Sequence, residues 1–137
     1  MRSRNRFTAQ QRMNAAEWLQ EQWASGARVK PAKCDVCGQT AGIIESHSED
    51  YSAPFGDHIG RWGLCYRCYM ILRYRFRHPT AFQAYCETLA SGRRFPPMLT
   101  HDFSQFARDH LRGGEPPTEE APEPPAGFGV ILSAPRR

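Results

Sequence analysis

The sequence predicts a small α+β fold, with a short β-hairpin and one helix at its centre, further α-helices around them and a C-terminal tail without stable structure. Three observations predict this fold. Two Cys-x-x-Cys pairs, Cys34/Cys37 and Cys65/Cys68, flank a short apolar strand segment and a polar loop. Segments rich in helix-forming residues precede and follow the pairs. The last 25 residues are rich in Pro, Glu, Ala and Gly.

The paired cysteines predict a structural zinc site. Each Cys-x-x-Cys pair chelates one edge of a tetrahedron from a tight turn, called a knuckle, and two pairs complete the coordination of one zinc ion. Gly38 follows Cys37 directly and permits the left-handed backbone of such a turn. The alternative is two pairs of reduced thiols without a metal, which leaves unexplained why four of the five cysteines fall in chelating pairs.

Composition divides the chain into three parts. Residues 1–30 comprise a basic arm and an N-terminal helix, residues 31–112 the cysteine-containing domain with its C-terminal helices, and residues 113–137 a Pro/Glu-rich tail. The tail cannot bury enough apolar surface to offset its ordering entropy, so we expect it to be disordered. Residues 1–112 contain sixteen Lys and Arg against ten Asp and Glu, whereas the tail contains two against four. A basic body favours an anionic partner such as DNA or another nucleic acid, and an acidic tail can compete for the same face. The alternative is a basic protein without a nucleic-acid role.

Hydropathy argues against a membrane protein. No apolar run approaches the ~20 residues that cross a bilayer, and no hydrophobic signal core follows the basic N-terminus. Because the cysteines are arranged for a metal, we expect a reducing compartment, the cytoplasm.

The N-terminal helix is predicted over residues 9–24. Thr8 and Gln11 fit a capping box at its start, and Gly26 is a suitable stop. The apolar positions expected on one face are Ala16, Leu19 and Trp23. This face packs on the body of the protein, or else it binds a partner.

The remaining elements follow from periodicity. Residues 42–47 predict a strand, a helix is expected from Cys65 to about residue 78, and Thr100 is expected to cap a last helix. A helix over residues 80–90 places Cys86 on its apolar face, which predicts a buried core thiol rather than a fifth metal ligand. The other residues on that face are Phe82, Tyr85 and Leu89.

A knuckle, a short hairpin and a second knuckle on the first turn of a helix form the order of a treble clef. The chain resembles the HNH (ββα-metal) endonuclease-like proteins of phages and bacterial mobile elements. Their zinc-stapled members read roughly Cys-x-x-Cys, His-His-Glu-Asp-Tyr-x-x-Pro and Leu-Cys-x-x-Cys-His. The corresponding residues here are Cys34 and Cys37, then His47-Ser48-Glu49-Asp50-Tyr51 with Pro54, then Leu64-Cys65-Tyr66-Arg67-Cys68-Tyr69. The resemblance covers about residues 32–79 and extends more loosely over the helices as far as Leu111.

The resemblance implies a nuclease site that is incomplete. In this family a histidine activates water for attack on a phosphodiester, and a divalent cation held by further His, Asn or Asp residues stabilises the leaving oxygen. Here Ser48 and Tyr69 stand where the family has histidines. Neither side chain replaces imidazole as a base near neutral pH.

A working nuclease site would use His47 as the base. Asp50 or Asp57, together with His58, would hold Mg²⁺, Mn²⁺ or Ni²⁺. Structural roles are the alternative for these residues. His47 would then be a hydrogen-bonded strand residue, Asp50 a cap of the loop, and His58 a solvated loop residue.

The segment after the second knuckle interleaves arginines with aromatic residues. In HNH-like folds the corresponding helix lies toward the DNA groove, so the resemblance implies that its guanidinium groups contact phosphates. The residues expected to bind nucleic acid are Arg61, Arg67, Arg73, Arg75 and Arg77, of which Arg73 and Arg77 would share one helix face. The alternative is that these arginines are only solvated.

The sequence therefore favours a zinc-binding, HNH-like protein that lacks nuclease activity and binds nucleic acid or a protein partner. The resemblance implies a regulatory or inhibitory role of the phage or plasmid type. Two alternatives remain. One is a divergent metal-dependent HNH endonuclease that uses His47, and the other is a protein-interaction adaptor with purely structural zinc.

Overall fold

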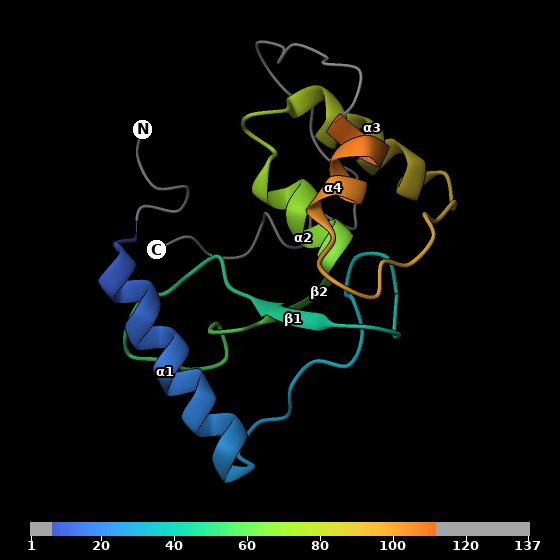
Figure 1. Ribbon diagram of the computed structural model, residues 1–137. Coiled ribbons are helices and arrows are strands. Elements are labelled where there is room, and N and C mark those ends of the chain that lie inside the picture. The colour runs from blue at the N-terminus through green and yellow to red at the C-terminus, as the bar shows by residue number, and fades with distance from the viewer. Residues whose placement is uncertain (1–6, 112–137) are drawn as a thin grey trace.

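The structure is a computed structural model that describes residues 7–111. This part contains four α-helices, one two-stranded antiparallel sheet and one π-helical turn, which confirms the predicted small α+β class. Helix α1 lies on one side of the hairpin, and helices α2 to α4 gather on the other side (Figure 1). In chain order the elements are α1 (Ala9–Ser25), β1 (Ile44–His47), β2 (Trp62–Cys65), α2 (Tyr66–Arg73), α3 (Pro79–Ala90), α4 (Phe103–Phe106) and the π-helix η1 (Ala107–Leu111). The predictions for the arm before Phe7 and for the tail, residues 113–137, lie outside the described residues.

Helix α1 begins and ends as predicted. The Thr8 hydroxyl accepts a hydrogen bond from the Gln11 N–H at 3.1 Å, and the Gln11 side chain accepts one from the Thr8 N–H at 2.8 Å. Gly26 ends the helix in the left-handed conformation, with φ of 83°. Of the predicted apolar face, Leu19 is buried and Trp23 packs on the same core, but Ala16 is exposed and Ala15 is buried in its place.

Helix α1 packs on the loop between the strands. Leu19 and Ile59 are buried in this small core, and Trp18 lies against Phe55 with ring centroids 5.7 Å apart. At the start of the helix, the ring of Phe7 contacts Tyr51 edge to face at 5.6 Å. The helix therefore holds the loop that carries Asp50, Asp57 and His58, whereas His47 lies at the end of β1.

The first knuckle forms hydrogen bonds with the edge of β2 that faces away from β1. In the hairpin, Ile44 pairs with Cys65 and His47 pairs with Trp62. On the other edge of β2, the Asp35 N–H donates to the Gly63 carbonyl at 2.7 Å, and the Gly63 N–H donates to the Asp35 carboxylate at 2.7 Å. The knuckle thus satisfies backbone groups that would otherwise be left unpaired on an edge strand.

Helix α2 is shorter than predicted. It ends at Arg73 rather than near residue 78, and the following residues form turns. The Arg75 N–H bonds to the Leu72 carbonyl at 3.2 Å, and the Arg75 guanidinium donates to the same carbonyl at 2.8 Å, which satisfies an acceptor at the helix end. Pro79 is the first residue of α3, and the residue before a proline disfavours helical backbone, so the two helices cannot be continuous.

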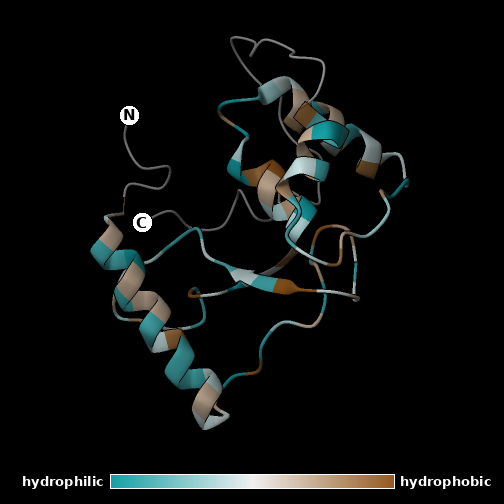
Figure 2. Cartoon of the chain, viewed as in Figure 1, coloured by the Kyte–Doolittle hydropathy of each residue, from teal (hydrophilic) through white to brown (hydrophobic). Residues whose placement is uncertain are grey.

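The main core lies between α2, α3 and α4. In Figure 2 the middle of α2 is hydrophobic and its C-terminal end is hydrophilic, in agreement with the burial of Ile71 and Leu72. The predicted apolar face of α3 is confirmed, because Phe82, Tyr85, Cys86 and Leu89 are all buried. Helix α4 is capped by Asp102, whose carboxylate accepts from the Gln105 N–H at 3.1 Å, and not by Thr100.

Candidate metal centre and basic surface

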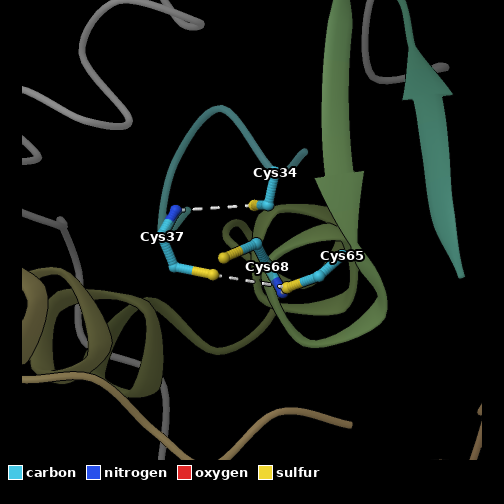
Figure 3. Close-up of side chains that lie close together, drawn as sticks. All are labelled: Cys34, Cys37, Cys65 and Cys68. Atoms are coloured by element: carbon cyan, nitrogen blue, oxygen red, sulfur yellow. Dashed lines mark hydrogen bonds between the residues drawn. The ribbon is translucent and has the colours of Figure 1, made fainter. Parts of the chain in front are cut away.

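The fold brings the four paired cysteines together. Cys34 and Cys37 lie in the first knuckle, Cys65 ends β2, and Cys68 lies in the first turn of α2. Their sulfur atoms all lie within 4.8 Å of one another and point toward a common centre (Figure 3). None of them forms a disulfide. The predicted group of four is therefore confirmed as one that could hold a metal ion.

The spacing and surroundings of the sulfurs fit a tetrahedral metal. Sulfurs about 2.3 Å from a tetrahedral ion lie about 3.8 Å apart, and the Sγ atoms of Cys37 and Cys65 are 3.7 Å apart. Each knuckle also stabilises thiolate, since the Cys37 N–H donates to the Cys34 sulfur at 3.5 Å and the Cys68 N–H to the Cys65 sulfur at 3.4 Å. Cys65 caps the N-terminus of α2, where the helix dipole favours negative charge.

The four thiols differ in their pKa values because they share one small volume. Side-chain hydrogen bonds from Cys37 and the other two thiols hold the pKa of Cys34 well below its usual range. Burial, followed by its hydrogen bonds to the other thiols, raises the pKa of Cys68. Four thiolates this close together, three of them buried, cannot coexist without a cation, and a shared metal ion favours the deprotonated form of each ligand. The fifth cysteine, Cys86, lies outside this group, and burial raises its pKa to about 12.

The residues predicted for a nuclease site form no second metal-binding group. Within residues 7–111, the four cysteines form the one group of His, Cys, Asp or Glu side chains that lie close enough together to hold a metal ion. The Asp50 carboxylate accepts from the Ser52 N–H at 2.9 Å, and the His58 Nε2–H donates to the Ser52 carbonyl at 2.7 Å. Asp50 and His58 therefore fix the loop around Ser52. Asp57, the other carboxylate considered, is exposed.

His47 is held by a buried carboxylate that the sequence interpretation left without a role. Its Nε2 lies 2.6 Å from Glu49 Oε2, and the other oxygen of Glu49 lies 3.4 Å from an Arg75 guanidinium nitrogen. The Glu49 side chain is 3% exposed and the His47 side chain 15%. The Tyr69 ring lies edge-on to the imidazole at 6.1 Å. The sequence signal for this contact is the His-x-Glu spacing, because side chains two residues apart in an extended chain point to the same side.

Ser48 also has a structural role. Its hydroxyl accepts from the Gly60 N–H at 2.6 Å, and its side chain is buried. This bond joins the two ends of the loop between β1 and β2.

Two of the five predicted nucleic-acid contacts are buried, so for Arg67 and Arg75 the prediction of an accessible guanidinium is wrong. Arg67 is 2% exposed and Arg75 is 6% exposed. Arg67 donates to the Pro96 carbonyl at 2.8 Å, to the Asp109 carboxylate at 2.9 Å and to His110 Nε2 at 2.9 Å. It therefore ties α2 to the C-terminal segment of the described chain.

The pKa values around Arg67 agree with this internal role. The hydrogen bond from Arg67 lowers the pKa of Asp109, which keeps the carboxylate ionised. Burial and the nearby Arg67 charge lower the pKa of His110 to about 4. His110 is therefore neutral near pH 7, and its Nε2 can accept a hydrogen bond from the Arg67 guanidinium.

The other three predicted arginines are exposed, and each is placed against an aromatic side chain. The Arg61 guanidinium lies 5.0 Å from the centre of the Trp62 ring, and that of Arg77 lies 5.4 Å from the centre of Tyr74. Arg73 donates to the Tyr69 hydroxyl at 3.2 Å. Phe76 lies between Arg73 and Arg77 in the chain, and its side chain is exposed, with 63% of its surface accessible.

Charge is unevenly distributed along the described chain. Residues 61–111 contain eight arginines and three carboxylates, whereas residues 7–60 contain four basic and seven acidic side chains. The positive charge therefore belongs to the half of the molecule built by β2 and the helices after it.

None of the helices in residues 7–111 is long and apolar enough to cross a membrane. Comparison of the chain with known protein families, with characterised proteins and with solved structures finds no match.

Substitution of two cysteines, one inside the group of four and one outside it, tests the metal site. Cys65→Ser removes one sulfur of the group, so we expect the protein to lose its tightly bound metal and to unfold at a markedly lower denaturant concentration. Cys86→Ala removes an equally buried thiol outside the group and should keep one metal per chain. Metal content after dialysis and urea unfolding measure both effects. Equal metal retention in the two variants would show that the four sulfurs do not form a binding site.

Proposed function

We propose that this chain is a zinc-stapled, HNH-like treble-clef protein that binds nucleic acid without cleaving it. The proposal has three parts: the identity of the metal, the binding surface and the loss of the catalytic set. The regulatory role of the phage or plasmid type belongs to the proposal through the resemblance to the HNH-like family alone.

Zinc is the metal that the donor set favours. Four thiolates in two Cys-x-x-Cys knuckles are the ligands of structural zinc sites, in which all coordination positions are filled by protein. The order of a knuckle, the β1–β2 hairpin and a second knuckle that opens α2 supports the treble-clef assignment. Bound zinc would supply no reaction here, but it would fix the hairpin and α2 relative to each other.

The binding surface is carried by the exposed arginines near the C-terminal end of α2. We define the α2 terminal surface as Arg73 and Arg77 with Tyr69, Tyr74 and Phe76. Both guanidiniums in it are exposed and are oriented by tyrosines, which reduces the entropy lost when they bind phosphates. Exposed Phe76 adds a ring on which a base can stack. This pairing of accessible arginines with aromatic rings is the observation that carries the proposal.

The residues that would have to perform cleavage support a binding role instead. Ser48 is buried and bonded to Gly60, and Tyr69 takes the place of the second expected histidine. Asp50 and His58 both bond to Ser52. These contacts use the polar side chains of the loop to maintain its conformation. We therefore assign a structural role to the loop and nucleic-acid binding to the exposed arginines.

Charge removal at the α2 terminal surface tests the binding proposal. For Arg73→Ala with Arg77→Ala, we expect several-fold weaker binding of single-stranded DNA and RNA, because two phosphate contacts are lost. The slope of log K against log salt should fall in magnitude by about 1.4 for a single strand. Fluorescence anisotropy between 50 and 200 mM salt measures both quantities.

The matched control is Lys30→Ala with Lys33→Ala. It removes the same charge from exposed positions in the segment between α1 and the first knuckle. If the two double variants weaken binding equally, the interaction is not localised at α2. If neither the wild type nor the variants bind nucleic acid, the protein-adaptor function takes its place.

A divergent nuclease is the second candidate, and one observation favours it. The His47 imidazole is oriented through Nε2 by buried Glu49, an arrangement that suits a general base. Its ring contacts Tyr69, whose hydroxyl receives the hydrogen bond from Arg73. A phosphate bound by Arg73 would thus lie on the same side of the molecule as His47.

A nicking assay separates the two candidates. We expect no cleavage of supercoiled or single-stranded DNA by the wild type in Mg²⁺, Mn²⁺ or Ni²⁺, because Ser48 and Tyr69 do not replace the expected histidines. Cleavage by the wild type that falls about 10²- to 10⁴-fold in His47→Ala would establish His47 as a general base and reject the binding-only proposal. Cleavage that persists in His47→Ala would indicate a contaminating nuclease.

A further inference from the structure

The Cys68 sulfur has a hydrogen-bond partner that belongs to neither knuckle. The hydroxyl of Tyr85, in the middle of α3, lies 3.0 Å from Cys68 Sγ. Tyr85 is 2% exposed and Cys68 is fully buried. A polar contact in this position is shielded from water, so its loss cannot be compensated by solvent.

Metal binding fixes the direction of this hydrogen bond. A thiolate that coordinates a cation has no proton to donate, so the tyrosine hydroxyl must be the donor. Cys34 and Cys65 accept their hydrogen bonds from backbone N–H groups of their own knuckles. Cys68 instead accepts from a side chain that another helix supplies. Partners of this kind orient metal ligands and tune their affinity.

The C-terminal segment of the described chain packs around the Tyr85 ring. Phe95 stacks on it, with ring centroids 4.9 Å apart and planes 4° from parallel. His110, in η1, lies edge-on at 5.1 Å. Both of these rings also contact Arg67, since the guanidinium lies 5.5 Å from the centre of Phe95 and bonds to His110. The orientation of the Tyr85 hydroxyl therefore depends on how residues 95–111 pack around its ring.

We propose that Tyr85 is a positioning residue of the metal centre, whose hydroxyl bond to Cys68 couples metal retention to the packing of residues 95–111. The inference rests on the proposed zinc site, and it assigns that site a partner outside its ligands. The coupling is reciprocal. Tight packing of Phe95 and His110 strengthens metal binding, and a bound metal holds the segment in place.

The test is zinc affinity measured by competition with a chromogenic chelator on the full chain. Tyr85→Phe keeps the ring and removes the hydroxyl, so we expect an affinity about 10- to 100-fold lower than that of the wild type. Tyr66→Phe is the control. Tyr66 is also buried and also contacts the C-terminal segment, through His101 at 4.7 Å and Phe106 at 6.5 Å, but the hydroxyl that bonds to Cys68 is that of Tyr85. The zinc affinity of Tyr66→Phe should equal that of the wild type.

A double-mutant cycle tests the coupling. Phe95→Leu removes the ring that stacks on Tyr85 and leaves every cysteine unchanged. In the otherwise wild-type chain it should weaken zinc binding. In the Tyr85→Phe background it should have no further effect, because the hydroxyl that it positions is gone. Unchanged affinity in Tyr85→Phe would overturn the inference while zinc binding stands, and additive effects would overturn the coupling. A wild type that retains no zinc would overturn the zinc proposal itself.

Discussion

The approach of four sulfur atoms to within one coordination sphere is the constraint on which this structure depends. It joins positions 28 residues apart, as in the pair Cys37 and Cys65, and so closes a loop whose entropy the small core must offset. The hairpin inside that loop has two short strands, and such hairpins are marginal in isolation. With a mean hydropathy of −0.63 the chain has little apolar surface to spare. A metal ion bound by the four sulfurs would supply folding free energy that the core lacks.

Local signals in the sequence were sufficient for the parts of the fold that depend on neighbouring residues. The capping box at Thr8, the Gly26 stop, the buried face of α3 and the cysteine group were all predicted, because spacing alone determines them. The burial of Arg67 and Arg75 could not be predicted in this way. Each is buried by partners far along the chain, Asp109 for one and Glu49 for the other, and an arginine-rich segment reads as exposed until those partners are known. The early end of α2 has a local cause, since the Arg75 guanidinium donates to the carbonyl of Leu72, three residues before it.

Glu49 links the two functional readings of the chain. One of its oxygens holds His47 and the other holds Arg75, which in turn caps α2, so the loop after β1 is tied to the end of the helix that carries the exposed arginines. In a nuclease this contact would orient the base, and in a binding protein it fixes the surface on which Arg73 and Arg77 stand. Under the proposed HNH-like relationship, Ser48 and Tyr69 stand where the family has histidines, which favours binding over cleavage.

We propose that one zinc ion is held by the four sulfur ligands and organises the hairpin and α2 around it. X-ray absorption at the zinc edge of the purified protein tests this arrangement, because the fine structure reports the number, type and distance of the ligands. We expect one zinc per chain with four sulfur neighbours at about 2.3 Å. A shell that includes nitrogen or oxygen, or a folded protein without stoichiometric zinc, would contradict it.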